Sequence, residues 1–293
     1  MQTQRKGALR VSLIVRTLGE RRAYLADAIR SAIAQVHRPL EILVVEDGGR
    51  RSEELVAELD RSAPGLIRYL PVPRCGRSAA GNAGLAAASG DYLGFLDEDD
   101  RLDAGHVGTL AEALDASPPA PAAFAASRMV LTEGLVQGLY PPRDRPVRIV
   151  GAAPFERGRL WIENDLPIQS VLFRRSVYES LGGFDESLPY LEDWDLWLRY
   201  SAAGDFVALP DATSTFRVPA ERATQSRRNA AHAAIRPRIL AKHKELSAVF
   251  TLAEIESLRA VLDARFEQSL SAAHCVRTLW RRFRRCFRRD GLA

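Results

Sequence analysis

Short apolar runs alternate with longer amphipathic segments through the first third of the chain. Four runs are rich in β-branched and other apolar residues, as buried parallel strands are: residues 11–15, 41–45, 66–70 and 92–96. Residues 24–36 carry apolar side chains at helical spacing and are followed by Pro39, and residues 52–59 are also helix-like. Strands that alternate with helices predict βαβ units, and therefore an α/β fold with a mostly parallel sheet flanked by helices.

The pattern changes after the first third. Residues 116–126 are rich in proline and alanine and form the best candidate for an internal boundary. Residues 132–166 lack periodicity, so we expect an irregular loop there, and residues 169–173 return as a strand. Residues 227–270 have helical spacing, with a kink or break expected at Pro237. The pattern therefore predicts a two-part domain followed by a helical C-terminal extension.

Four consecutive acids, Asp97 to Asp100, follow the apolar run at residues 92–96. In an open α/β sheet, ligands bind beyond the carboxyl ends of the strands, where these acids would lie. Four close carboxylates repel one another and lose hydration if they are partly buried. A divalent cation bound to a polyphosphate would relieve both problems, because Mg²⁺ takes one or two carboxylates together with phosphate oxygens. The alternative is an acidic loop that caps the next helix.

A second acidic segment, Glu192-Asp193-Trp194-Asp195, opens a helix in the C-terminal half. Acids in a first helical turn interact favourably with the helix dipole, which is the structural interpretation. In the functional interpretation, one carboxylate points into a cleft as a general base. Asp193 is the better candidate for that base, because aromatic residues that can exclude water flank it.

A segment rich in small residues lies between these two sites. Residues 76–88 read GRSAAGNAGLAAA, and such residues allow a helix to pack closely against a sheet. Arg77 gives the same segment a second interpretation, because a guanidinium binds phosphate with two parallel hydrogen bonds. The composition of the segment favours close packing over phosphate binding.

Composition excludes several classes of protein. The 293 residues are 46% hydrophobic and 27% charged, as in soluble globular proteins, and no apolar run reaches the roughly 20 residues that span a bilayer. The N-terminal segment lacks the apolar core of a secretory signal. The three cysteines have no metal-ligand spacing, so we expect reduced thiols and a cytoplasmic protein.

The net charge of +4 hides a very basic tail. Residues 275–289 contain seven arginines and no acid, so subtraction (4 − 7) leaves about −3 for the rest of the chain. Val276, Trp280, Phe283 and Phe287 fall on one face of a helix there, opposite the arginines. A basic amphipathic helix predicts an anchor on an anionic membrane surface. Docking on the protein itself or on a partner is the main alternative, and nucleic acid binding is a weaker one.

Four segments in this order resemble glycosyltransferase family 2, nucleotide-sugar enzymes with the GT-A fold. The similarity runs over residues 11–217 and rests on VSLIVRT with AIRSAIAQ, EILVVEDGG, GRSAAGNAGLAAASGDYLGFLDEDD and GGFDESLPYLEDWDLWLR. It implies a nucleotide-sugar-binding half at residues 1–117 and an acceptor-binding half at 118–226. Residues 227–293 would then be the helical extension with its basic tail.

The resemblance also implies roles for individual residues. On the donor side, Thr17 lies along the nucleotide, Asp47 holds the base with Glu46 beside it, and Arg77 lies near the base or diphosphate. Asp97 and Asp99 match the Asp-x-Asp motif that holds Mn²⁺ or Mg²⁺ on the diphosphate, and Asp193 matches the catalytic base. The expected reaction is an inverting transfer from a UDP- or dTDP-sugar to a hydroxyl of a glycan or lipid-linked acceptor. Bacterial surface-glycan assembly on the inner face of the plasma membrane would suit such an enzyme.

Acceptor-side contacts have no motif to guide them. We expect them from the side chains Asn164, Gln169, Ser170, Glu192 and Trp194. The chain departs from the family pattern at three places: Arg16 stands where proline is usual, Glu46 where aspartate is commoner, and Pro219 where many relatives have histidine. The last change removes an expected metal ligand and leaves Arg217 as a phosphate contact.

Two other classes of function stay open at this point. A sugar-nucleotide nucleotidyltransferase also uses an α/β sheet and a carboxylate-bound metal, but it normally has a basic, glycine-rich loop after the first strand, which VRTLGERR matches poorly. A non-catalytic nucleotide-sugar-binding module would keep the fold without needing Asp97, Asp99 and Asp193 together.

Overall fold

A computed structural model describes residues 9–247, 253–260 and 262–263. The chain divides into two compact units, Met1–Leu246 and Ser247–Ala293. In the second unit, residues 253–260 and 262–263 are helical. The basic tail predicted at residues 275–289 lies outside the described residues.

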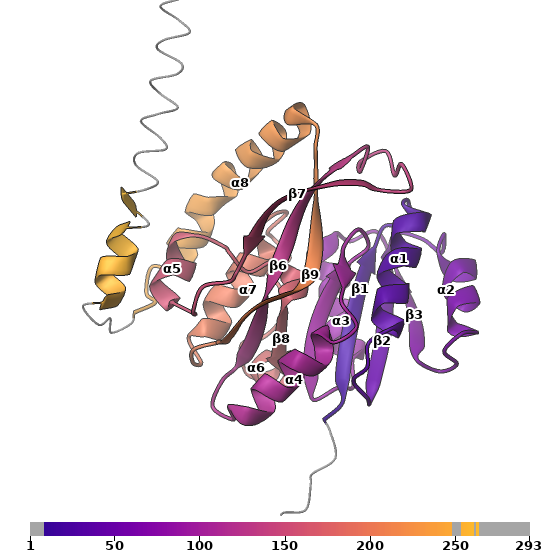
Figure 1. Ribbon diagram of the computed structural model, residues 1–293, viewed down its shortest axis with the longest axis horizontal. Helices are drawn as coiled ribbons and strands as arrows, with labels where there is room; N and C mark the ends of the chain where they lie inside the picture. The colour runs from indigo at the N-terminus through magenta and orange to yellow at the C-terminus, as the bar shows by residue number, and fades with distance from the viewer. Residues whose placement is uncertain (1–8, 248–252, 261, 264–293) are drawn as a thin grey trace, which may run out of the picture. The chain divides into compact units, whose positions relative to one another are not determined.

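The first unit is built around a single sheet with helices on both faces (Figure 1). Its strands are β1 (Val11–Thr17), β2 (Leu40–Asp47), β3 (Ile67–Val72), β4 (Tyr92–Asp97), β5 (Arg101–Leu102), β6 (Ala122–Glu133), β7 (Arg143–Val150), β8 (Val171–Arg174) and β9 (Val207–Pro219). Its helices are α1 (Arg22–Ile33), α2 (Glu53–Asp60), α3 (Arg77–Ala87), α4 (His106–Ala116), α5 (Arg157–Ile162), α6 (Arg175–Leu181), α7 (Glu192–Ser201) and α8 (Arg222–Lys242), and a 3₁₀ turn covers Ile168–Ser170.

The sheet has the order β3-β2-β1-β4-β8-β6-β9-β5, and β7 pairs with β6 outside this path. Strands β3, β2, β1 and β4 are mutually parallel, as the alternating pattern predicted. Beyond β4 the sheet is mixed, because β8 is antiparallel to both of its neighbours while β6 and β9 are parallel to each other. The two expected halves of the domain, divided near residue 117, both contribute strands to this sheet.

Alternating side chains of the strands belong to two separate hydrophobic cores, one on each face of the sheet. Leu13 and Val15 pack with α1, α2 and α4 on one face, whereas Ile14 packs with α3, α7 and α8 on the other. Two fully buried tryptophans of α7, Trp194 and Trp197, fill much of the second core. Burial of this kind stabilises the fold by roughly 25 cal/mol for each Å² of apolar surface removed from water.

Two expectations about the C-terminal half were wrong. Residues 132–166 are not irregular throughout, because β6 continues to Glu133 and returns as the hairpin strand β7. Strand β7 is almost entirely exposed and rich in arginine, so it carries no apolar pattern that the sequence could reveal. Helix α8 also continues through Pro237, because Ile235 and Ile239 anchor it to the core on either side of the proline.

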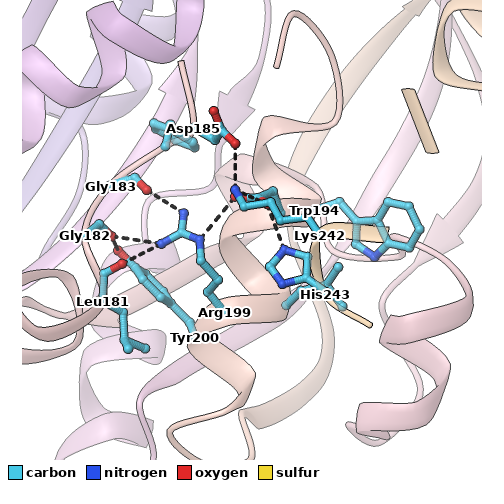
Figure 2. Close-up of polar contacts among 12 residues, drawn as sticks. Leu181, Gly182, Gly183, Asp185, Trp194, Arg199, Tyr200, Lys242 and His243 are labelled. Carbon is cyan, nitrogen blue, oxygen red and sulfur yellow. Dashed lines mark hydrogen bonds and ion pairs between the residues drawn. The ribbon is translucent and has the colours of Figure 1, made fainter. Parts of the chain in front are cut away.

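The C-terminal end of α8 is fixed to α7 by a buried carboxylate. Asp195 is fully buried and lies 2.8 Å from both Lys242 Nζ and His243 Nε2 and 3.1 Å from Arg199 Nε. Lys242 also pairs with Asp185 at 2.7 Å, and Figure 2 shows the side chains of Asp185, Arg199, Lys242 and His243 converging. Burial alone raises the pKa of Asp195, but hydrogen bonds from His243 and Lys242 hold that pKa below its ordinary value. We call Asp195, Arg199, Lys242 and His243 the α7–α8 clamp.

No helix in the described part of the chain is both long enough and apolar enough to cross a membrane.

Candidate functional site

A large cavity opens beyond the carboxyl ends of the parallel strands. It has a volume of about 1400 Å³ and is lined at its base by Thr17, Asp47 and Asp97, the last residues of β1, β2 and β4. The N-terminal ends of α3 and α7 form part of its wall, and residues of β9 and α8 form another part. The position matches the general rule that open α/β sheets bind ligands at this edge.

Arg16 connects the two acidic segments across this cavity. The register of β1 and β4 pairs Arg16 with Asp97, and its Nε donates to Asp97 Oδ1 at 2.8 Å. Its Nη1 lies 3.2 Å from Glu192 Oε1 at the start of α7. The guanidinium is buried, with 5% of the side chain exposed, and it packs against the rings of both Phe95 and Phe184. One cation therefore joins the acids after β4 to the residue next to Asp193.

The four acids after β4 differ in exposure. Glu98 and Asp100 are buried, whereas the side chains of Asp97 and Asp99 are 26% and 19% exposed. Arg21 lies 2.8 Å from Glu98 Oε1 and 2.7 Å from Asp99 Oδ2, so a second arginine neutralises this group. Thr17 donates its hydroxyl hydrogen bond to Glu98.

Burial and neighbouring charge set the protonation of these acids in opposite directions. Burial, with repulsion from Asp99 and Asp97, holds the pKa of Asp100 well above its ordinary value. Burial also raises the pKa of Glu98, although Arg21 opposes this. For Asp97 burial again favours the neutral acid, but Arg16 and Arg77 outweigh it and lower the pKa. Asp97 is therefore ionised at neutral pH, whereas the pKa of the neighbouring Asp100 favours its protonated form.

Asp97 and Asp99 fit a hard divalent cation that also binds phosphate. Within the described residues, no group of three or more His, Cys, Asp and Glu side chains is placed to hold a metal ion. Arg16 and Arg21 each engage one oxygen of the neighbouring carboxylate, Oδ1 of Asp97 and Oδ2 of Asp99, so each acid keeps a second oxygen for a ligand. Two carboxylate oxygens supplemented by phosphate oxygens are an ordinary donor set for Mg²⁺.

Asp193 lies in the first turn of α7 and lines the same cavity. Burial, together with the negative charge of Glu192, raises its pKa to about 6. A hydrogen bond from Asn164 and the charge of Arg16 act in the opposite direction. The preceding residue, Leu191, has φ 59°, a left-handed conformation that is uncommon for a branched side chain. Such strain persists only where surrounding structure enforces it, and here it sets the start of α7.

Several nucleotide-side candidates line the same cavity. Asp47 accepts backbone hydrogen bonds from Cys75 and Gly76 at 2.7 and 3.1 Å, so it holds the turn that precedes α3. Arg77, the first residue of α3, is half exposed and lies 3.6 Å from Glu192. Thr17, Asp47 and Arg77 all line the cavity.

Two predicted donor contacts have other partners. Glu46 does not line the cavity; it is fully buried and accepts hydrogen bonds from the amides of Arg51 and Ser52 at the start of α2 and from Tyr69. Its expected contact with the nucleotide is not supported by this placement. Arg217 lines the cavity, but its guanidinium pairs with Asp144 at 3.0 Å and donates to the carbonyl of Asp99 at 2.7 Å. Through this hydrogen bond, Arg217 helps to hold the acidic loop in place.

The acceptor-side candidates divide in the same way. Asn164, Gln169 and Glu192 line the cavity. Ser170 does not; its hydroxyl donates to the carbonyl of Pro167 at 2.7 Å. Trp194 lies in the core with its indole N–H bonded to the carbonyl of Leu160, because its position in α7 directs it away from the face that carries Asp193. The structure thus brings three of these five residues to the cavity.

Sequence reasoning missed several residues of the site. Arg16 was noted only as an exception to a proline position, and Arg21 and Glu98 had no assigned role. The signal for Arg16 was present, since an arginine that ends a buried strand needs a carboxylate partner. The side chains that α8 contributes to the cavity gave no such signal, because the tertiary fold alone brings that helix back.

Comparison with known proteins decides the family. The family model described as "Glycosyl transferase family 2" matches residues 12–180, more than half of the chain. The chain belongs to glycosyltransferase family 2. This membership confirms the resemblance inferred from the motifs.

Relatives that are similar in sequence are named as glycosyltransferases. The chain is 28% identical over 200 residues to the uncharacterized glycosyltransferase YwdF of Bacillus subtilis, covering 68% of this chain and 69% of that protein. It is 32% identical over 179 residues to an uncharacterized glycosyltransferase of Mycobacterium tuberculosis, covering 60% and 63%. A match to an uncharacterized glycosyltransferase of Nostoc is 38% identical, but it spans 31% of this chain and only 29% of that protein.

Solved structures of glycosyltransferases share the fold. A mannosyltransferase from Pyrobaculum calidifontis, solved with GDP-Man and Mn²⁺, has a TM-score of 0.62 at 18% identity and covers 94% of this chain and 82% of its own. S. aureus TarS 1-349 with UDP-GlcNAc has a TM-score of 0.58 at 15% identity and covers 74% and 61%. These similarities confirm the GT-A-like α/β fold of this family member.

Proposed function

We propose that the protein transfers a sugar, with inversion, from a nucleoside-diphosphate sugar to a hydroxyl group of an acceptor. The observation that carries the proposal is the Arg16 bridge, which places the acids after β4 and the start of α7 on one guanidinium inside one cavity. Donor activation needs the first group and proton removal needs the second, so both must act on the same small volume.

The donor is proposed to lie at the α3 side of the cavity. Asp47 is proposed to accept a hydrogen bond from the nucleotide base, with Thr17 and Arg77 of the same cavity lining contributing further donor contacts. A UDP or dTDP sugar is the proposed donor class, because a carboxylate accepts the N3–H that uracil and thymine share. Structural neighbours are bound to UDP-GlcNAc or to GDP-Man, which supports a nucleotide sugar as the class.

Asp97 and Asp99 are proposed to hold Mn²⁺ or Mg²⁺. The neighbouring mannosyltransferase structure contains Mn²⁺, and the two free carboxylate oxygens here are a suitable donor set. When bound, the ion supplies positive charge that stabilises a departing nucleoside diphosphate. Arg16 and Arg21 hold the two carboxylates in place and offset their mutual repulsion.

Asp193 is proposed as the general base. An acceptor hydroxyl would give its proton to a carboxylate oxygen of Asp193 as the hydroxyl oxygen attacks the anomeric carbon from the face opposite the leaving group. A pKa of about 6 keeps the carboxylate mostly ionised at neutral pH while making it more basic than an ordinary aspartate. Direct displacement needs no covalent sugar–enzyme intermediate.

Donor turnover tests the proposal. Purified protein is incubated with UDP-, dTDP- and GDP-sugars and Mn²⁺, and release of nucleoside diphosphate is measured with and without candidate acceptors. We expect Asp97→Asn to abolish release and Asp193→Asn to reduce acceptor-dependent release by about 10²–10⁴-fold. Asp211→Asn is the matched control, because Asp211 is exposed on β9 and lies outside the cavity. Pyrophosphate release would instead indicate a nucleotidyltransferase, and binding without turnover would indicate a non-catalytic module.

The basic tail remains a separate proposal about location. We propose that residues 275–289 attach the protein to the anionic cytoplasmic leaflet, near a lipid-linked or glycan acceptor. Flotation of the full chain and of a 1–270 truncation with phosphatidylglycerol vesicles tests this. Equal flotation of the two proteins would contradict it.

A further inference from the structure

One wall of the cavity is strongly basic. Helix α8 contains six arginines and lysines between Arg222 and Lys242 and no acid. It contributes Thr224, Gln225, Arg227, Arg228, Asn229, His232 and Arg238 to the cavity lining. The positions 224, 228 and 232 recur every four residues, so one face of the helix lies along the cavity. We call Arg227, Arg228, His232 and Arg238 the α8 wall.

The arginines of the α8 wall differ from those at the base of the cavity. At the base, Arg16, Arg21 and Arg77 each lie within 4 Å of a carboxylate. In contrast, Arg227, Arg228 and Arg238 form no ion pair with any described residue. These three arginines therefore have no direct carboxylate partner in the described part of the chain. A ligand with negative charge would supply the missing partner.

The wall is held rigidly enough to form a binding surface. Ile235 and Ile239 of the same helix are buried in the core, and the α7–α8 clamp fixes its C-terminal end. His232 packs against Tyr190 with a ring-centroid distance of 5.8 Å. Burial and the charges of Arg228 and Arg77 lower the pKa of His232. The ring is therefore neutral at neutral pH and can donate one hydrogen bond and accept another.

We propose that the α8 wall binds a phosphate group of the acceptor, so that the protein glycosylates a phosphate-bearing substrate. The inference rests on the proposed function and names the acceptor class. Guanidinium groups bind phosphate through paired hydrogen bonds, and two adjacent arginines present several such donors. The donor diphosphate is assigned to the acidic loop with its ion, so the wall is left for the second substrate. A soluble sugar phosphate and a lipid phosphate share this chemistry.

The test measures phosphate binding when the donor site is already filled. The full-length protein is saturated with UDP and Mn²⁺, and glucose 6-phosphate and glucose are titrated separately by calorimetry. A second arm measures sedimentation with phosphatidylcholine vesicles that contain or lack dioleoyl phosphatidate. The variant carries Arg227→Ala and Arg228→Ala together. The control, Arg222→Ala, removes an arginine from the same helix outside the cavity lining.

The variant should bind phosphate at least about tenfold more weakly than wild type in one of the two arms, because each lost charge-assisted contact costs about that factor. The arm that responds identifies a soluble or a lipid phosphate. Neutral glucose should show no such difference, and the control should match wild type. Equal phosphate affinities in variant and wild type, or an equal loss in the control, would overturn the inference while leaving the proposed function intact.

Nucleotide affinity separates the remaining cases. The variant should bind UDP with Mn²⁺ within about twofold of wild type. A loss of UDP affinity as large as the loss of phosphate affinity would assign the wall to the donor diphosphate and overturn the acceptor assignment. Failure of the wild-type protein to bind any nucleoside diphosphate would refute the proposed function, and the acceptor assignment with it.

Discussion

Replacing Asp193 with asparagine should stabilise the protein while it removes most of the transfer activity. The native carboxyl has a pKa of about 6, compared with 3.8 for the ordinary group, because burial and Glu192 oppose its charge. The native state therefore binds a proton more tightly than the unfolded chain does. The stabilisation that comes from this proton is complete below pH 3.8 and is lost as the pH rises through about 6. Above that pH the folded protein carries a charge that destabilises it.

The magnitude follows from the shift. A difference of about 2 pKa units corresponds to at most about 3 kcal/mol, at about 1.4 kcal/mol for each unit. The side chain keeps some contact with water, which screens the charge, so we expect a gain of about 1–2 kcal/mol at pH 8. Asparagine keeps the oxygen that accepts the amide hydrogen bond of Trp194, so the start of α7 should be retained.

Urea unfolding followed by circular dichroism at pH 4 and pH 8 measures the effect. The stability difference between Asp193→Asn and wild type should be small at pH 4 and should reach its full value above pH 6. Asp211→Asn, an exposed acid outside the cavity, should show no difference that grows in this range. The rate of wild-type transfer should fall as the pH drops below about 6. The assignment of Asp193 would be refuted if the stability gain of Asp193→Asn over wild type were no larger at pH 8 than at pH 4. Full activity of the variant would refute it as well.

Three further predictions concern other buried contacts. Arg16→Met should destabilise the protein by about 3 kcal/mol in urea unfolding, because it removes the ion pair of Asp97 and leaves the buried Glu192 with only its longer contact to Arg77, and Arg16→Lys should recover part of this loss. In Arg16→Met, the acid limb of the pH–rate profile should move upward, since the charge of Arg16 lowers the pKa of Asp193. Asp195→Asn should cost about 2–4 kcal/mol, an effect that calorimetry should find only above about pH 4, because the native pKa of Asp195 lies below 3.8 and its stabilisation is lost as the pH falls through that pKa. Gly84→Ala should destabilise by about 1–2 kcal/mol net of helix propensity, because the new Cβ would lie 2.5 Å from Ile14 Cγ2. Gly108→Ala, where the nearest atom is 3.8 Å away, should instead raise the melting temperature.

Local pattern was sufficient for the N-terminal half of the fold. Parallel strands buried on both faces must be apolar throughout, so β1, β2 and β4 are visible in the sequence as continuous runs. The same pattern fixes where each strand ends, and polar residues at those ends identified Asp47 and Asp97 as candidates. Gly84 shows why α3 is rich in small residues, since the helix approaches Ile14 too closely for a larger side chain. The interpretation that favoured close packing of this segment agrees with the contact.

The C-terminal half needed the tertiary structure, because its elements take their stability from distant partners. Strand β7 is an exposed edge strand whose pairing with β6 carries no apolar signature. The sequence marked Trp194 and Glu46 as polar or aromatic neighbours of the site, but only the fold shows that both side chains point away from the cavity.

The sequence by itself determined the family, the parallel core and the two acidic segments, because each depends on residues that are close together in the chain. Only the tertiary structure decided that Arg16 neutralises both acidic segments, which are separated by almost one hundred residues. It also decided that the basic face of α8 returns to the same cavity. Charge pairing across such separations depends on where the backbone places the partners, and a linear pattern does not contain that information.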